Sequence, residues 1–204
     1  MNGKNHAIAG AGAGIAMAIT FAKAGSVEGV VLSIPAALAG AKLPDADHPN
    51  TKQGKIFSAV RATAPIVAVA VALAYLYLVV YHNIAFNAWI IAIPIMVAWM
   101  LRDGTWFWGH RHGTHTLIFP LMFLVLYVCL RVEYQTVSET ILSLDAGYLS
   151  HLVADTFTAR GCPLLYPFVK KEISLTKVKS KEENKCRAIA IVISLFTIVL
   201  SIVL

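Results

Sequence analysis

Charged residues are scarce in this chain. Only 14% of its 204 residues are Asp, Glu, Lys or Arg, whereas an ordinary soluble domain has about 25%. Hydrophobic residues make up 58% of the chain, and its mean hydropathy is +0.69. This composition excludes an ordinary soluble protein and indicates an integral membrane protein.

Several signatures of common protein classes are also missing. The chain has no glycine-rich phosphate loop, no dinucleotide fingerprint and no G-x-S-x-G motif, which argues against nucleotide-driven and serine-hydrolase chemistry. Cys129, Cys162 and Cys186 show no C-x-x-C spacing, so neither a disulfide framework nor a thiolate zinc site is predicted. The N-terminal segment has a single Lys4 and no convincing cleavage site, and we expect it to remain as the first helix.

Apolar segments that approach the roughly 20 residues needed to cross a membrane are 62–81, 84–101, 116–130 and 188–204. Segment 7–22 is rich in Ala and Gly, and segment 29–41 is short. We expect both to pack inside a bundle, where small residues allow close backbone approach. The weakest predicted crossing is 29–41.

A seventh segment, 141–159, contains Asp145, His151 and Asp155, so it must turn a polar face inward. The predicted fold is therefore all-α: a polytopic membrane bundle of about six to seven transmembrane helices, forming one integral membrane domain over residues 1–204.

The basic residues are unevenly divided between the two faces of this predicted bundle. If all seven segments cross, only Lys23 and Arg131 of the 17 Lys and Arg residues lie opposite the N-terminus. The positive-inside rule then predicts a cytoplasmic N-terminus, an external C-terminus and a basic cytoplasmic loop at 170–187. Membrane lipids are the expected partners of this inner-membrane protein, and no nucleic-acid partner is expected.

All histidines except His82 converge on the predicted cytoplasmic face. His151 and Asp155 are four residues apart, so they share one face of a helix and can present a nitrogen and an oxygen to one ion. The alternative is a helix-stabilising pair. In a membrane segment an ionisable pair favours the functional interpretation.

The stretch "PDADHP" holds Asp45, Asp47 and His48 between two prolines, which hold the segment extended or turned and prevent its absorption into a neighbouring helix. Such a short loop can direct several ligands to one point. The alternatives are a polar turn capped by Asp45 and a role for Asp47 in orienting imidazoles that bind a metal.

The stretch "GHRHGTHT" contains three histidines within six residues. His110 and His115 can approach each other because Gly113 lets the backbone bend between them. Arg111 lies between two histidines and indicates an anionic ligand such as phosphate, which Arg binds in a bidentate manner. The alternative is an interfacial loop whose histidines lie among lipid headgroups.

The candidate metal ligands are His6, Asp47, His48, His110, His115, His151 and Asp155. A tetrahedral zinc needs only about four ligands, so the surplus predicts one or two ions. A nitrogen and oxygen set without thiolate favours Zn²⁺, with Mn²⁺ or Fe²⁺ as alternatives.

Three blocks of this sequence, "LPDADHP", "GHRHGTHT" and "GYLSHLVADTFTARGCPLLYPF", resemble the signature blocks of the YdjM-like family of bacterial and archaeal membrane proteins. That family is predicted to consist of metal-dependent hydrolases. The positions that match its pattern are His6, Asp45, Asp47, His48, His110, Arg111, Thr114, His115, Gly147, His151, Asp155, Thr158 and Gly161. The chain departs from the pattern at His112, where the family usually has Gly.

These observations predict a membrane-bound metal-dependent hydrolase whose active site faces the cytoplasm. A metal-activated water would attack a phosphoester of a lipid or lipid-linked substrate. Asp45 is the expected general base or acid, and Arg111 is expected to bind a phosphoryl oxygen. The alternatives are a divalent metal transporter, whose site usually lies near the bilayer midplane, and a membrane scaffold in which a metal only links loops.

Overall fold

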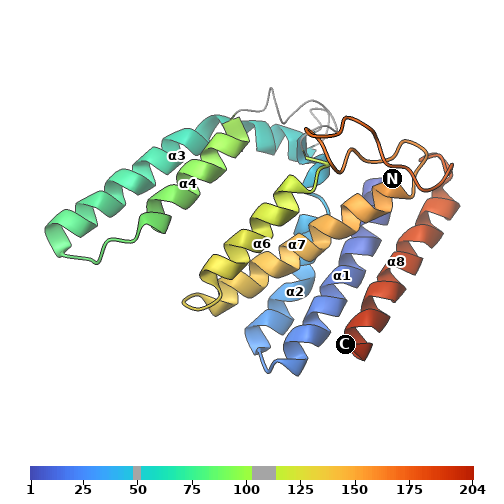
Figure 1. Cartoon of the computed structure of the whole chain (residues 1–204), viewed down its shortest axis with the longest axis horizontal. Coiled ribbons are helices and arrows are strands. Elements are labelled where there is room, and N and C mark those ends of the chain that lie inside the picture. The colour runs from blue at the N-terminus through green and yellow to red at the C-terminus, as the bar shows by residue number, and fades with distance from the viewer. Residues whose placement is uncertain (48–51, 103–113) are drawn as a thin grey trace. The chain divides into compact units, whose positions relative to one another are not determined.

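The computed structural model describes residues 1–47, 52–102 and 114–204 (Figure 1). Within these residues the prediction of an all-α protein is confirmed, since they form seven α-helices and no β-strand. The elements are α1 (Gly3–Lys23), α2 (Val27–Gly40), the 3₁₀ helix η1 (Pro44–Asp47), α3 (Lys52–His82), α4 (Ala88–Arg102), α6 (Ile118–Leu130), α7 (Gln135–Thr156) and α8 (Glu183–Val203).

Among the residues that the structure describes, three helical stretches are long and apolar enough to cross a membrane: Gly3–Lys23, Ala62–His82 and Glu183–Val203. The helices α2 and α6 have 14 and 13 residues, so each is about 20 Å long at about 1.5 Å per residue. Each of the seven predicted segments thus contains a helix, but these two are shorter than a hydrocarbon core of about 30 Å.

Apolar side chains cover the exposed surface of α8. Those that are more than half exposed are Val192, Leu195, Phe196, Val199, Ile202 and Val203. An exposed apolar surface of this kind marks a contact with membrane or protein. On a helix of membrane-spanning length it suits a hydrocarbon environment.

The chain divides into two compact units. Unit 2, Ala46–Gly113, contains α3 and α4, which pack against each other as a helical hairpin. Tyr75 of α3 donates a hydrogen bond from its Oη to the carbonyl oxygen of Ala85, in the connection between the two helices (2.9 Å). Unit 1 consists of Met1–Asp45 and Thr114–Leu204 and contains the other five α-helices.

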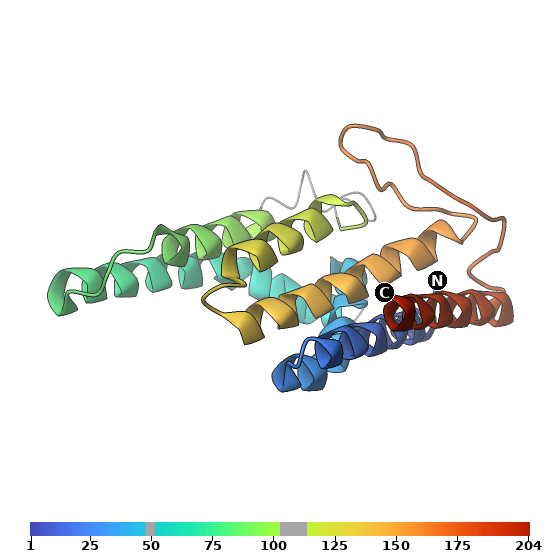
Figure 2. The ribbon, with the colours of Figure 1, turned by 60° about the horizontal axis from the view of Figure 1, so that its bottom comes forward.

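Helix α1 packs against α2, α7 and α8, and α7 also packs against α2 and α6 (Figure 2). Helices α1 and α8 run in the same direction. At their C-terminal ends Lys23 Nζ donates hydrogen bonds to the carbonyl oxygens of Ser201 and Ile202, both at 2.9 Å. At their N-terminal ends Met1 packs against Cys186.

Two glycines allow α2 and α7 to approach closely. A Cβ at Gly147 would overlap the Ala37 carbonyl group, and one at Gly40 would overlap the Leu144 carbonyl group. Backbone atoms cannot move aside as a flexible side chain can, so only glycine fits at this crossing. The contact holds the C-terminal half of α7 against the end of α2, where the polar side chains described below are found.

Helix α7 begins and ends earlier than the predicted segment 141–159. Its first turns contain Glu139, which is buried. Ser26 Oγ donates a hydrogen bond to Glu139 Oε2 (2.5 Å), and Gln135 Nε2 donates one to Oε1 (2.9 Å). These bonds satisfy the carboxylate inside unit 1, so polar residues extend the helix beyond its apolar part.

The loop 157–182 joins α7 to α8 and folds back over the end of α7. Thr158 Oγ1 donates a hydrogen bond to the Asp155 carbonyl oxygen (2.8 Å), which helps to end the helix. Further along, Leu175 N donates to the Thr156 carbonyl oxygen (2.7 Å), and Leu117 N donates to the Leu164 carbonyl oxygen (2.9 Å). The loop is therefore attached both to α7 and to the segment that leads into α6.

Candidate metal centre

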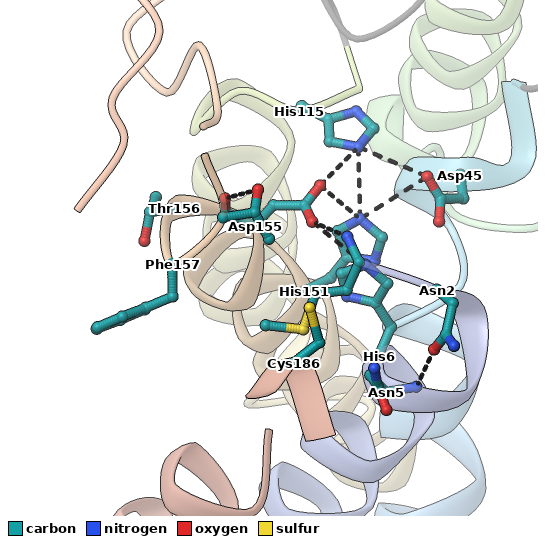
Figure 3. A network of polar contacts seen from close by, with 12 residues as sticks. Asn2, Asn5, His6, Asp45, His115, His151, Asp155, Thr156, Phe157 and Cys186 are labelled. Carbon is teal, nitrogen blue, oxygen red and sulfur yellow. Dashed lines mark hydrogen bonds and ion pairs between the residues drawn. The ribbon is translucent and has the colours of Figure 1, made fainter. Parts of the chain in front are cut away.

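Five polar side chains from four parts of the sequence gather at one end of unit 1 (Figure 3). His6 lies in the first turns of α1, Asp45 in η1 and His115 just before α6, while His151 and Asp155 lie near the end of α7. The three imidazoles and Asp155 are each at most 1% exposed, whereas the Asp45 side chain is 44% exposed. The cluster is thus buried, with one carboxylate at an accessible edge.

The ligand atoms of this cluster are closely spaced. His151 Nε2 lies 3.4 Å from His115 Nε2 and 3.7 Å from Asp155 Oδ2. His115 Nε2 lies 3.6 Å from Asp155 Oδ2 and 3.7 Å from Asp45 Oδ1. Asp45 Oδ1 in turn lies 4.0 Å from His151 Nε2.

These distances fit a divalent metal ion. With bonds of about 2.0–2.1 Å, neighbouring ligand atoms around a tetrahedral zinc lie about 3.3–3.4 Å apart. The observed separations of 3.4–4.0 Å need only a small contraction to match. Two overlapping sets, His6 with His151 and Asp155, and Asp45 with His115 and His151, each have three ligand atoms close enough for one ion.

Hydrogen bonds orient two of the imidazoles toward the cluster. His151 Nδ1 lies 2.8 Å from the Ala41 carbonyl oxygen. Because a carbonyl can only accept, Nδ1 carries the proton and the Nε2 lone pair faces the other ligands. His115 Nδ1 lies 3.1 Å from Thr114 Oγ1, and Tyr148 Oη donates to the Thr114 carbonyl oxygen.

His6 completes the inner side of the cluster. Its ring stacks on that of His151, with ring centroids 3.6 Å apart and an interplanar angle of 12°. Its Nε2 lies 3.3 Å from Asp155 Oδ1, and neither ring nitrogen makes a hydrogen bond to another described residue. A buried imidazole with this unmet bonding capacity suits a metal ligand. The Met1 amino group lies 2.6 Å from the same Asp155 oxygen.

Nearby thiols are not ligands in this arrangement. Cys162 Sγ donates a hydrogen bond to the His115 carbonyl oxygen (3.0 Å), and Cys186 Sγ donates one to the Lys179 carbonyl oxygen (3.7 Å). A thiol that donates is protonated, whereas a metal ligand must be a thiolate. The ligand set is therefore made of nitrogen and oxygen.

The electrostatics of Asp45 reflect its position among the imidazoles. Partial burial raises the pKa of its carboxyl group, but the interaction with His115 and the charges of His151 and His6 lower it further. The pKa consequently lies well below its ordinary value. Asp45 is thus a carboxylate, the form that binds a cation.

The structure brings together four of the predicted ligands, His6, His115, His151 and Asp155. It also places Asp45, predicted as a general base or acid, among the ligand atoms. Asp47 lies in η1, but its side chain is outside the described part of the structure, as are the whole residues His48, His110, Arg111 and His112.

Sequence reasoning missed the groups that hold these ligands in place. The Ala41 carbonyl gives no signal because any residue supplies one. Tyr148 had a signal, since it precedes His151 by three residues on the same helix. The hydrogen bond from Cys162 depends on the path of loop 157–182, which no local pattern predicts.

Helices of membrane-spanning length and a buried cluster of histidines and aspartates define this protein as an integral membrane protein with a candidate metal centre. A comparison with family models identifies its family. The family model described as "YdjM inner membrane protein" matches residues 1–204, and the chain belongs to this family. The resemblance of the three sequence blocks is confirmed, as is the assignment to the inner membrane. No curated protein and no solved structure matches the chain.

Proposed function

We propose that this protein is a metal-dependent hydrolase of the inner membrane, acting on a phosphoester of a lipid or lipid-linked substrate. The observation that carries the proposal is the cluster of three buried imidazoles and two carboxylates at one end of unit 1. A cluster so placed lies near the headgroup level rather than at the bilayer midplane. That position favours chemistry at the membrane surface over transport.

His115, His151 and Asp155 would hold the ion, with His6 and Asp45 available for a fourth ligand or a second ion. Zn²⁺ suits this set best, and Mn²⁺ or Fe²⁺ are alternatives. When bound, the metal supplies a hydroxide at neutral pH, because it lowers the pKa of water from about 15.7 to about 7. The protein's part is to orient the imidazoles through Ala41 and Thr114 and to exclude bulk water.

Asp45 is the residue that we assign to the substrate side. It is the one exposed member of the cluster, so an incoming substrate meets it first. Its carboxylate can bind the ion or accept a proton from water, depending on how many ions the cluster holds. Arg111 is proposed to bind a phosphoryl oxygen, on the basis of its place between two histidines in the sequence.

The distribution of charge in unit 1 supports a cytoplasmic site. Only Lys23 and Arg131 lie at the end opposite the cluster. The basic residues at the cluster end are Lys4, Lys42, Arg160, Lys170, Lys171, Lys177, Lys179, Lys181, Lys185 and Arg187. By the positive-inside rule the cluster faces the cytoplasm, with the N-terminus inside and the C-terminus outside. Reporter fusions at both ends test this, and reporters on the same side would contradict it.

The function is tested with the protein purified in mild detergent. Metal content is measured by elemental analysis, and hydrolysis is measured on a panel of phospholipids and simple phosphodiesters. We expect His151→Ala to lose metal and activity, while His82→Ala at the end of α3 and His112→Gly keep both. Hydrolysis without bound metal would overturn the proposal. So would a metal-loaded protein that cleaves nothing on the panel but moves Zn²⁺ or Mn²⁺ across vesicle membranes.

A further inference from the structure

An apolar groove runs along unit 1 between α7 and α8, with α1 as its floor. Its volume is about 590 Å³, within the range of about 300–1,000 Å³ typical of ligand sites. The floor is formed by Ala13, Ala16 and Met17 of α1, and the small side chains of the two alanines leave room above them. The groove forms because α7 and α8 both pack on α1 and diverge from each other.

The groove offers a ligand almost no polar surface. Its two polar lining residues are Ser150 and Thr197. Ser150 Oγ donates to the Gly147 carbonyl oxygen (2.7 Å), and Thr197 Oγ1 donates to the Ser194 carbonyl oxygen (2.9 Å). Both hydroxyls are thus satisfied within their own helices, and the groove wall presents hydrocarbon. An occupant must therefore be apolar along its whole length.

The length of the groove matches one lipid chain. Its wall on α7 extends from Ala146 to Phe157, about 16 Å at about 1.5 Å per residue. This is about half of a hydrocarbon core of about 30 Å, the depth of one leaflet. The other walls belong to α1 and α8, which have the length and composition of membrane spans, so the groove lies in the lipid phase.

One end of the groove reaches the level of the metal centre. Phe157 lines the groove only two residues beyond Asp155, and it points away from the cluster, on the other side of the helix end (Figure 3). Ile193 lines the groove and also packs against Met1, Ala154 and Cys186, the apolar layer next to the cluster. A chain in the groove would therefore place its headgroup at the end of α7 that carries the ligands.

Basic residues lie in and just after loop 157–182, which joins the two helices that form the groove walls. Arg160 follows α7, and Lys181 precedes α8; both are exposed, and neither forms an ion pair with another described residue. Lys185 and Arg187 also lie there but pair with Glu182 and Glu183. The unpaired cations complement an anionic headgroup.

We propose that this groove binds one acyl chain of an anionic membrane phospholipid and so presents its headgroup at the depth of the metal centre. The groove would select for a lipid that carries a hydrocarbon chain and a phosphate, rather than for a soluble phosphoester. That the bound lipid is the substrate rests on the proposed hydrolase function. The proposal that an acyl chain occupies the groove does not depend on that function.

The test uses the full-length protein in vesicles of phosphatidylethanolamine and phosphatidylglycerol, the latter carrying a diazirine in one acyl chain. After irradiation, labelled residues are mapped by mass spectrometry. We expect label to concentrate on groove residues such as Met17 and Leu149 relative to Leu195 and Val199 on the outer surface of α8. Label spread evenly over groove and outer surface would show ordinary surrounding lipid and overturn the proposal.

Two variants fill the groove with a ring, Val153→Phe and Ala146→Phe, and Leu195→Phe adds the same ring outside it. We expect the first two to lower groove labelling about tenfold, since the ring displaces at least two buried methylenes. Leu195→Phe should label like the parent. Unchanged labelling in filled but folded variants would refute the proposal, and if they misfold, the distribution of label on the parent decides.

The same experiment separates the groove from the hydrolase. Asp155→Asn is expected to keep groove labelling while losing metal, because Asp155 does not line the groove. If the parent hydrolyses no lipid but its groove is labelled, the hydrolase proposal fails and the lipid site stands. If it hydrolyses phospholipid without groove labelling, only the lipid site fails.

Discussion

Asp155→Asn is the substitution that tests the metal centre most directly. Asp155 is 1% exposed, and its carboxylate oxygens lie 3.3–3.7 Å from ring nitrogens of His6, His115 and His151. Asparagine has nearly the same shape, so the packing is retained while the negative charge and one anionic ligand are lost. We expect the variant to fold and to bind divalent metal much more weakly.

The magnitude follows from the expected role of Asp155 as a direct metal ligand. Losing a group that only orients a ligand typically costs about 10–100-fold in metal affinity, so losing a direct ligand should cost at least about 100-fold. At a metal concentration of about 100 times the Kd, binding stabilises the parent by about 2.7 kcal/mol. A Kd raised about 100-fold leaves about 0.4 kcal/mol at the same concentration.

The assay is thermal unfolding in detergent with and without Zn²⁺. For a chain of this size about 1 kcal/mol corresponds to about 2–4 °C, so metal should raise the Tm of the parent by about 5–11 °C and that of Asp155→Asn by about 1–2 °C. Asp145→Asn is the matched control, since Asp145 is buried on the same helix but lies outside the cluster. Equal metal-dependent shifts in Asp155→Asn and the parent would refute the metal centre.

Three further outcomes are expected. Gly147→Ala should destabilise the protein by about 1–3 kcal/mol or more and weaken metal binding, because the new methyl overlaps the Ala37 carbonyl. Gly3→Ala should be nearly neutral in the same thermal unfolding assay, since no atom lies within 4 Å of its added Cβ. Tyr148→Phe should lower the free energy of unfolding by about 1 kcal/mol and the metal affinity about 10–100-fold, because the Thr114 carbonyl loses its hydrogen bond. The affinity is measured by titration with a metal-sensitive dye. An unchanged affinity would mean that this bond does not position His115. A chelator should return the Tm of the Zn²⁺-treated parent to its metal-free value, a fall of about 5–11 °C, whereas the Tm of Zn²⁺-treated Asp155→Asn should fall by only about 1–2 °C. Equal falls in both would place the stabilising ion elsewhere.

The class of this protein follows from its amino-acid sequence. Low charge and seven apolar segments predicted an all-α membrane protein, because a chain in hydrocarbon must satisfy its backbone within helices. The spacing of His151 and Asp155 predicted that they share a helix face, because helical geometry relates residues four apart. These inferences need only local periodicity and composition.

Contacts between distant segments set which groups meet around these two residues. His6, Asp45 and His115 lie on other segments, and their approach depends on the crossing of α2 and α7, where Gly40 and Gly147 allow backbone contact. The same crossing brings the end of α2 to His151, so that the Ala41 carbonyl accepts from its Nδ1. No local pattern encodes these contacts, because they join residues far apart in the sequence.

The early start of α7 and the place of Asp45 have the same origin. Glu139 extends the helix because Ser26, more than a hundred positions earlier, donates a hydrogen bond to its carboxylate. Asp45 appeared in the sequence as a free acid or base, yet the folded chain places its Oδ1 3.7 Å from His115 Nε2. Local sequence shows which side chains can bind an ion, whereas packing between distant helices sets the distances at which they do so.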